Sequence, residues 1–440
     1  MNYLISLISQ YLHERKLRKQ THGIKIKYNW TMNILMINQP PFNRGDESAH
    51  KGLLRTLRKR MTSANIRFLY PMGDIESIRQ YSKGIEGVEY LPSPEAFLKA
   101  GLFVWQGMHK GRTWLWHFHP LFQQYKNHYK WADVVVCAPG GICMGGFQDW
   151  HHIFLLKMAK YFHKPLVYYG RSFGPFPTET QSNREFKRVS LEMLNYFSFL
   201  SIRDHKTEVL AKELGISYIP TVDSAFLDSP SVYIPWEIRR AISGGDYMVF
   251  VPNYLRWHFA YKDIEHKTVV SFYSNVIKEI WNQYPELKIV MLPQLFCGSR
   301  YEVSDVEFFR DMAEDMSDER VVVVPDCYSS DVQQAIIKEA KFLIGARYHS
   351  IVFAINQNTP FIALSYEHKI SGLLETLGKE DCCIEFSNTL RSKDGQDSAL
   401  SDIKKKMMVL KKDEDVQKRA KTVADNCMKQ LVDYLNTFDK

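Results

Sequence analysis

Five side chains that can bind or protonate an anion come just after short apolar runs of the sequence. They are Arg171, Arg203, Arg347, His349 and Lys369. A guanidinium binds phosphate or carboxylate through two parallel hydrogen bonds, and lysine adds a point charge. A histidine can donate a proton near neutral pH. These residue types together indicate an anionic substrate, with His349 as a candidate general acid.

Glycines, acidic residues and a tyrosine accompany these groups after the same apolar runs. The further candidates for substrate binding are Asn43, Gly45, Asp46, Glu47, Gly140, Gly141 and Tyr366. Glycine lets the backbone approach a ligand closely, and a helix that begins there offers backbone N–H donors. Asp46 or Glu47 either accepts a proton from a substrate hydroxyl or caps the helix that follows, and of the two we favour the cap.

Each of these residues also has a purely structural interpretation. An arginine after a strand is often part of an ion pair, and a histidine that begins a helix is more often structural than catalytic. We interpret the pairs His117/His119 and His151/His152 as structural. The seven cysteines lack the Cys-x-x-Cys spacing of zinc sites, and the sequence predicts no metal. The functional interpretation therefore depends on the coincidence of several such groups.

Short apolar runs alternate with helical patterns along two stretches of the chain. The predicted strands are 32–38, 66–70, 133–137, 166–169 and 199–202, then 247–251, 288–292, 321–324, 342–344 and 361–364. Helices are expected between them, the first from about Glu47 to Arg60. This alternation is typical of parallel sheets with right-handed crossovers. The predicted fold class is therefore α/β, with two doubly wound Rossmann-like domains.

Ligands of such sheets bind beyond the carboxyl ends of the strands, so we expect the active site in the cleft between the domains. The expected organisation is an amphipathic basic segment at 1–31, a first domain at 32–235, a second domain at 236–390 and a charged helical tail at 391–440.

The net charge of +8 is concentrated towards the two ends of the sequence. Residues 1–30 hold six cations and one acid, and residues 401–440 hold ten cations and seven acids. A nucleic-acid-binding protein carries a basic stripe on its folded body, so this distribution favours an anionic membrane surface and argues against nucleic acid. Residues 1–20 fit a helix on lipid and a helix packed on the protein equally well.

No apolar run reaches the roughly 18 residues of a membrane span. We expect a cytoplasmic protein, and the inner face of the cytoplasmic membrane is a candidate place of action.

The order of the motifs resembles that of the polysaccharide pyruvyl transferase family. The resemblance extends over about residues 33–380 and is carried by Asn43-x-Gly45-Asp46-Glu47, Gly140-Gly141, Gly170-Arg171-Ser172-Phe173-Gly174-Pro175, Ile202-Arg203-Asp204, Val222-Asp223-Ser224-Ala225-Phe226, Gly345-x-Arg347-x-His349 and Tyr366-x-x-Lys369. The sequence departs from the family at Arg171, where glutamine is common, and at Glu367-His368, where an Asp-Pro-like pair is common.

The resemblance implies a fold like that of the two-domain glycosyltransferases of the B type and an enzyme that moves pyruvate from phosphoenolpyruvate to a sugar. The product is a cyclic ketal that bridges two hydroxyls, in the biosynthesis of a bacterial capsular or exopolysaccharide, and a lipid-linked acceptor is favoured. No cofactor or metal is implied. On this interpretation His349 supplies a proton, Arg347 and Lys369 hold the phosphate and carboxylate, and Arg203 or Arg171 completes the clamp.

Two other functions fit the same sequence. A glycosyltransferase that uses a nucleotide sugar would share the fold and would bind a diphosphate with the same cations. A non-catalytic protein that docks on a membrane assembly through its basic ends would use none of them. Binding of phosphoenolpyruvate separates the first interpretation from both alternatives.

Overall fold

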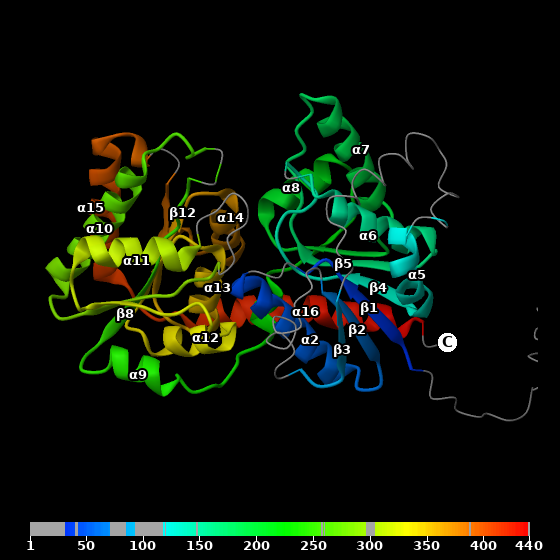
Figure 1. The fold of residues 1–440 in the computed structure, drawn as a ribbon, viewed down its shortest axis with the longest axis horizontal. Coiled ribbons are helices and arrows are strands. Elements are labelled where there is room, and N and C mark those ends of the chain that lie inside the picture. The colour runs from blue at the N-terminus through cyan, green and yellow to red at the C-terminus, as the bar shows by residue number, and fades with distance from the viewer. Residues whose placement is uncertain are drawn as a thin grey trace, which may run out of the picture.

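The computed structural model describes most of the chain between residues 31 and 438. The described residues are 31–39, 43–70, 85–92, 118, 120–146, 148–256, 258, 260–295, 304–386 and 389–438. The amphipathic helix that we predicted in residues 1–20, and the pair His117/His119, lie outside these ranges. Two parallel sheets covered by helices make up the described part (Figure 1). None of the described helices combines the length and the apolar character that a membrane span needs.

The first sheet has seven parallel strands in the order β3-β2-β1-β4-β5-β6-β7. They are β1 (Asn33–Ile37), β2 (Asn65–Tyr70), β3 (Val88–Pro92), β4 (Val134–Cys137), β5 (Leu166–Arg171), β6 (Phe199–Ile202) and β7 (Ile219–Pro220). The central strands are buried on both faces and read as continuous apolar runs, which is why the sequence predicts them. The sequence did not predict β3 and β7, since an edge strand that is very short or mixed with polar residues lacks such a run.

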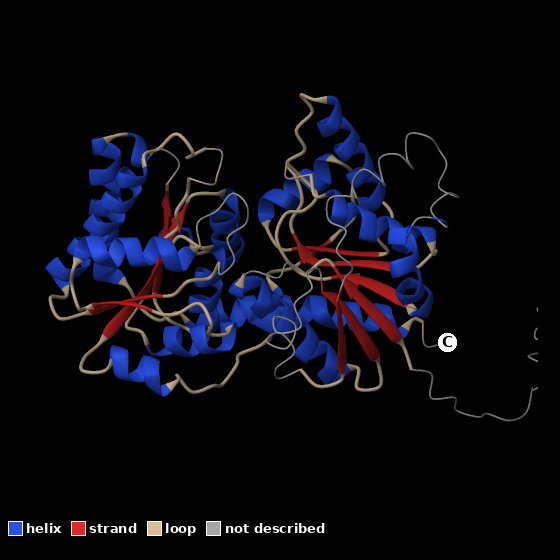
Figure 2. Cartoon of the chain, in the orientation of Figure 1, coloured by secondary structure: helices blue, strands red, loops and turns tan. Residues whose placement is uncertain are grey.

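Helices cover both faces of this sheet (Figure 2). They are α2 (Arg44–Arg60), α5 (Pro120–Trp131), α6 (Trp150–Tyr161), α7 (Gln181–Leu194), α8 (His205–Glu213) and the short 3-10 helix η2 (Ser224–Leu227). Asn43, Asp149, Thr180 and Asp204 each cap a helix by accepting a backbone N–H two or three residues further on. We call this sheet with these helices the first lobe.

The second sheet has six parallel strands in the order β10-β9-β8-β11-β12-β13, and we call it with its helices the second lobe. Its strands are β8 (Tyr247–Val251), β9 (Lys288–Met291), β10 (Val321–Val323), β11 (Leu343–Gly345), β12 (Phe361–Ser365) and β13 (Cys383–Glu385). Its helices are α9 (Trp236–Ile242), α10 (His266–Gln283), α11 (Asp305–Met316), α12 (Ser330–Glu339), α13 (Tyr348–Asn356), α14 (His368–Leu377), η3 (Glu380–Cys382), η4 (Thr389–Arg391) and α15 (Lys393–Val409). The predicted fold class, two doubly wound α/β sheets, is confirmed, although the edge strand β13 was not predicted.

The strand order reverses once in each sheet, between β1 and β4 and between β8 and β11. At such a switch point the loops leave the sheet in opposite directions, and a ligand can enter between them. Gly140 and Gly141 follow β4, and Arg347 and His349 follow β11. The sequence candidates therefore include residues at the switch points of both sheets.

The helix α16 (Glu414–Asn436) joins the two lobes along their shared side (Figure 1). It contacts α13 and α14 of the second lobe and α2 and β6 of the first lobe. Cys427, Met428, Leu431 and Leu435 are buried in the core on one face of the first sheet. The predicted charged tail thus contains an apolar stripe that completes the core of the first lobe.

We predict that Leu431→Ala lowers the free energy of unfolding by about 2–5 kcal/mol, because Leu431 is fully buried in that core. Gln430→Ala is the matched control, since the neighbouring side chain is exposed and should change stability by less than about 0.5 kcal/mol. Denaturant unfolding of both variants measures the difference. Equal stability of the two variants would contradict the packing of α16 on the first sheet.

Candidate active site

The start of α2 lies where the two lobes meet. The Asn43 side chain accepts the N–H of Gly45 at 2.7 Å, and the backbone N–H of Arg44 donates to the Gln294 carbonyl of the second lobe at 2.9 Å. The helix therefore begins at Arg44, three residues before the predicted start at Glu47. The favoured prediction that Asp46 or Glu47 caps this helix is wrong, because Asn43 is the capping residue.

Glu47 forms part of a buried ion-pair network between the lobes. Its carboxylate accepts from Arg44 at 2.7 Å and from Lys51 at 2.6 Å, and Lys51 also lies 3.3 Å from Asp331 of α12. The backbone N–H of Ser330 donates to the same carboxylate at 3.3 Å. Glu47 therefore fastens α2 to the start of α12, which is a structural role.

The imidazole of His349 lies directly over the backbone of Gly45. A Cβ atom at Gly45 would stand 1.9 Å from both Cγ and Nδ1 of His349 and 2.3 Å from its Cβ. Only a glycine permits this approach, because the backbone of α13 fixes the position of the histidine Cβ and leaves it little freedom to move aside. The first turn of α13 is thus seated on the first turn of α2.

Asp223 receives charges from both lobes. Arg203 Nη1 donates to Asp223 Oδ2, and His349 Nε2 lies 3.4 Å from the same oxygen. The other carboxylate oxygen accepts the N–H of Ala225 at 2.9 Å. Burial alone would raise the pKa of Asp223, but Arg203 and His349 outweigh it and lower that pKa to about 2. Asp223 is therefore ionised at neutral pH although it is fully buried.

Asp46 has the opposite environment in the same place. Its carboxyl is buried, and burial raises its pKa even though His349, Arg203 and Arg171 act in the other direction. Two carboxyls with pKa values shifted apart are the usual basis for separate acid and base roles in one site. We call Asp46, Arg171, Arg203, Asp223 and His349 the interlobe cluster.

Arg171 is fully buried and binds the backbone at the carboxyl ends of two strands. It donates to the carbonyls of Asn38 at 2.9 Å, Ala138 at 2.6 Å and Gly141 at 3.0 Å, and to Cys143 Sγ at 3.0 Å. Gly140 also pairs with it through a single β-bridge. All four of these acceptors are neutral, so Arg171 shapes the Gly140-Gly141 turn and adds positive charge to the interlobe cluster.

Arg347 and Lys369 lie at the carboxyl ends of neighbouring strands of the second sheet. Arg347 Nη2 donates to Asp305, whose other oxygen accepts the N–H groups of Gln294 and Leu295, both at 2.9 Å. Lys369 Nζ lies 3.2 Å from Glu367, which also accepts from the hydroxyl of Tyr366 at 3.1 Å. The two cations are therefore oriented by separate carboxylates.

The structure thus divides the candidates into four groups, and Gly140 and Gly141 lie beside the first of them, against Arg171. Asp46, Arg171, Arg203 and His349 belong to one cluster, Arg347 follows the same strand as His349, and Lys369 with Tyr366 forms a group after β12. Asn43, Gly45 and Glu47 build the seam between the lobes. Asp223 and Asp305 were given no role from the sequence. Asp223 stands in one of the quoted motifs. Asp305 begins a helix that Ser304 caps, and Ser304 and Glu307 together form a capping box.

One group among the described residues has the spacing of metal ligands. Ligand atoms of Cys143, Asp149 and His152 lie within 4.8 Å of one another. Two of the three already have partners, since Cys143 accepts from Arg171 at 3.0 Å and Asp149 caps α6 by accepting the N–H of His152 at 2.9 Å. Burial lowers the pKa of His152 well below its usual value, so its ring is neutral. These contacts hold the loop after β4 in place.

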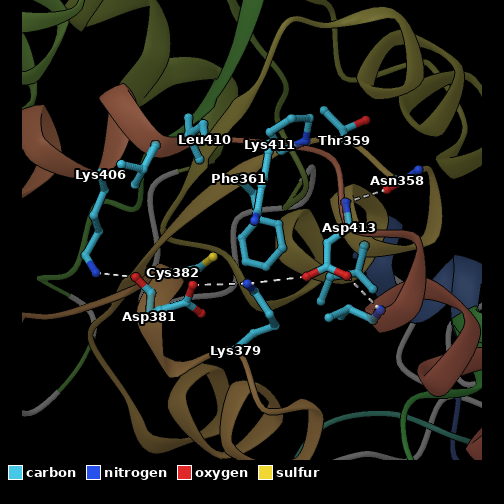
Figure 3. Close-up of a pocket in the computed structure, with 14 residues that line it drawn as sticks. Asn358, Thr359, Phe361, Lys379, Asp381, Cys382, Lys406, Leu410, Lys411 and Asp413 are labelled. Atoms are coloured by element: carbon cyan, nitrogen blue, oxygen red, sulfur yellow. Dashed lines mark hydrogen bonds and ion pairs between the residues drawn. The ribbon is translucent and has the colours of Figure 1, made fainter.

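A separate cavity lies at the opposite end of the second sheet. Phe361, the first residue of β12, stands inside it, and Lys379 bridges Asp381 at 3.1 Å and Asp413 at 3.5 Å (Figure 3). Because this is the amino end of the strands, the cavity is remote from Arg347 and His349, which follow β11 at the carboxyl end. It contains none of the candidates from the sequence.

We predict that Gly45→Ala lowers the free energy of unfolding by about 1–3 kcal/mol, because a Cβ at this position overlaps His349. Gly146→Ala is the control, since a Cβ there meets no described atom within 4 Å. Thermal unfolding of both variants is the measurement. A Gly45→Ala protein as stable as the control would mean that α13 does not rest on α2.

Solved structures share this arrangement of two lobes. A putative UDP-N-acetylglucosamine 2-epimerase from Listeria monocytogenes aligns over 93% of this chain and 97% of its own, with a TM-score of 0.56 and 9% identity. The UDP-GlcNAc 2-epimerase from Neisseria meningitidis, bound to UDP-GlcNAc, aligns over 92% of this chain and 100% of its own, with a TM-score of 0.54 and 10% identity. At these identities the likeness concerns the fold alone, and it agrees with the predicted two-domain architecture.

Sequence comparison identifies relatives of another kind. The chain is 23% identical over 268 residues to the amylovoran biosynthesis protein AmsJ of Erwinia amylovora, and the match covers 58% of this chain and 62% of AmsJ. The chain thus matches less than two thirds of that relative. The profile of the family described as polysaccharide pyruvyl transferase matches residues 43–368, which include every member of the interlobe cluster and Arg347. On this match over most of its length, the chain belongs to the polysaccharide pyruvyl transferase family.

Proposed function

We propose that this protein transfers pyruvate from phosphoenolpyruvate to two hydroxyls of a sugar, as a cyclic ketal, and releases inorganic phosphate. The observation that carries the proposal is the meeting of His349 with Arg203 and Asp223 at the carboxyl ends of two sheets, beside Arg347. The family supports the same reaction class. No metal or cofactor enters the proposed chemistry.

The donor carries a phosphate and a carboxylate, so it needs cations at more than one point. Arg347 and Arg203 are already oriented by buried aspartates, which lowers the entropy lost when a guanidinium binds an anion. Lys369 remains partly exposed at 19% and can turn towards a ligand from Glu367. In our proposal these three side chains hold the donor, while Arg171 acts through its charge because both of its Nη atoms already bind backbone carbonyls.

The reaction begins with protonation of the donor. His349 gives a proton to the methylene carbon, and the first sugar hydroxyl forms a bond to the adjacent carbon while losing its own proton. The bond between that carbon and the phosphate oxygen then breaks, and phosphate leaves. The second hydroxyl then forms a bond to the same carbon and closes the ring. Its proton goes to the phosphate, which is released as hydrogen phosphate. Fixing both reactants between the lobes supplies much of the acceleration.

Asp46 is the group that we propose to accept a proton from the sugar. The sequence left Asp46 and Glu47 as alternatives for this role, and Glu47 is held by Arg44 and Lys51. Asp46 instead faces the charges of the interlobe cluster, and its raised pKa brings its proton affinity closer to neutral pH.

We propose that the acceptor belongs to the precursor of a bacterial surface polysaccharide, because AmsJ is described as an amylovoran biosynthesis protein. The excess positive charge of residues 1–30 and 401–440 supports a lipid-linked acceptor and a site of action at the inner face of the cytoplasmic membrane.

We predict that His349→Gln lowers turnover by about 10²–10⁴-fold and leaves the affinity for phosphoenolpyruvate within a few-fold, because the imidazole acts on the proton rather than on the anion. Phosphate release in the presence of candidate sugar acceptors measures turnover, and calorimetric titration measures affinity. Turnover that persists in this variant would exclude His349 as the acid.

We predict that Arg347→Gln weakens binding of phosphoenolpyruvate by about 2–5 kcal/mol, because a buried charge-assisted contact is lost. Titration with UDP-GlcNAc is the parallel measurement, since the fold is shared with an epimerase bound to that molecule. Binding of UDP-GlcNAc without binding of phosphoenolpyruvate would favour a nucleotide-sugar glycosyltransferase. Binding of neither would favour a non-catalytic docking protein.

A further inference from the structure

The carboxylate of Asp223 orients Arg203 in the proposed reaction, but its contact with His349 has no role there so far. We infer that Asp223 is a positioning residue, which holds the imidazole of His349 in a fixed orientation across the boundary between the lobes. The catalytic role of His349 in this inference rests on the proposed function. The pairing of Asp223 with His349 rests on the contacts of Asp223 alone.

The segment that carries Asp223 is clamped against α2. Ser224 Oγ donates to the carbonyl of Ala49 at 2.7 Å, and a Cβ at Gly52 would lie 2.2 Å from the Ser224 carbonyl oxygen. Gly45 and Gly52 are seven residues apart, two turns of the helix, so they lie on the same face of α2. That face therefore seats His349 at one end and the Asp223–Ser224 turn at the other, which fixes their separation.

Asp223 itself has little freedom to turn away. One oxygen accepts the N–H of Ala225 at 2.9 Å as the cap of η2, and the other receives Arg203. Arg203 is held in turn, since its guanidinium carbon lies 4.9 Å from the centre of the Tyr348 ring. A carboxylate fixed at both oxygens presents a constant negative charge to His349 Nε2, 3.4 Å away.

The charged groups that face His349 come from three segments. Asp223 follows β7, Asp46 belongs to α2, and Arg203 follows β6 and donates to Asp223. From its own helix, the Tyr348 ring lies 5.0 Å away. Asp223 is the acidic group whose oxygen lies within ion-pair distance of the imidazole. Nε2 faces Asp223, and Nδ1 lies on the side of the ring that faces Gly45.

The first test needs no substrate. Nitrogen-15 labelling of the histidines, with His349→Gln to identify the signal, gives the pH midpoint of the His349 ring in the full chain. We predict that Asp223→Asn lowers this midpoint by about 1 pH unit or more, because a negative charge is removed beside the ring. Asp305→Asn is the matched control, since Asp305 is equally buried and pairs with Arg347 instead. A midpoint that Asp223→Asn leaves unchanged would overturn the inference.

The second test measures the reaction. In Asp223→Asn the alkaline limb of the pH profile of kcat should move to lower pH, with kcat reduced at least about tenfold and more than KM for phosphoenolpyruvate is raised. Asp223→Glu, which keeps the charge, should restore the position of the limb. Asp305→Asn should mainly raise KM. An alkaline limb that stays in place in Asp223→Asn would mean that Asp223 is only structural.

The two tests separate this inference from the proposed function. A shifted midpoint in a protein that neither binds nor turns over phosphoenolpyruvate keeps the Asp223–His349 pairing and removes pyruvyl transfer. If Asp223→Asn fails to fold, the ring midpoint of Asp223→Glu decides: a midpoint that stays within about 0.3 pH units of the parent agrees with a retained carboxylate, and one that falls by a full unit contradicts it.

Discussion

Charge buried between two lobes is the constraint on which the rest of this structure depends. A charged side chain removed from water is costly unless an opposite charge or a hydrogen bond compensates it. The compensation here crosses the boundary, since Asp223 of the first lobe faces His349 of the second and Lys51 of α2 faces Asp331 of α12. Such contacts act only over a few ångströms. The relative placement of the sheets must therefore be accurate to the same degree, and the fold supplies that accuracy through short backbone contacts.

The helix α2 provides most of these contacts because it belongs to one lobe and begins inside the other. Its first residue, Arg44, bonds to the second lobe twice. Its backbone N–H donates to the Gln294 carbonyl, and its side chain donates to the Asp326 carbonyl at 2.7 Å. Gly45 lacks the Cβ atom that would separate α2 from α13, and Gly52 lacks the one that would separate α2 from Ser224. Packing against both lobes thus constrains the position of α2, and the close approaches require small residues in it, whether or not its side chains touch a ligand.

The sequence predicted the architecture well because buried parallel strands consist of consecutive apolar residues, which can be recognised in a sequence. It missed β3, β7 and β13, whose edge positions impose no such run. It also identified the members of the interlobe cluster, except that it gave Asp223 no role, since a single aspartate after a short edge strand has no periodic signature. Pairing across lobes, as between His349 and Gly45, depends on how two sheets are placed in space. No local pattern carries that information, and the same reason hid the structural role of Glu47.

The path of α16 has a consequence for the order in which the protein can be built. Cys427, Met428, Leu431 and Leu435 belong to the core of the first lobe, yet a ribosome makes them only after the entire second lobe. The earlier lobe thus leaves the ribosome with part of one sheet face uncovered, beside α2, and this part stays uncovered while about two hundred further residues are made. During that interval its apolar face is open to chaperones, and the finished second lobe is already present when α16 arrives to close it.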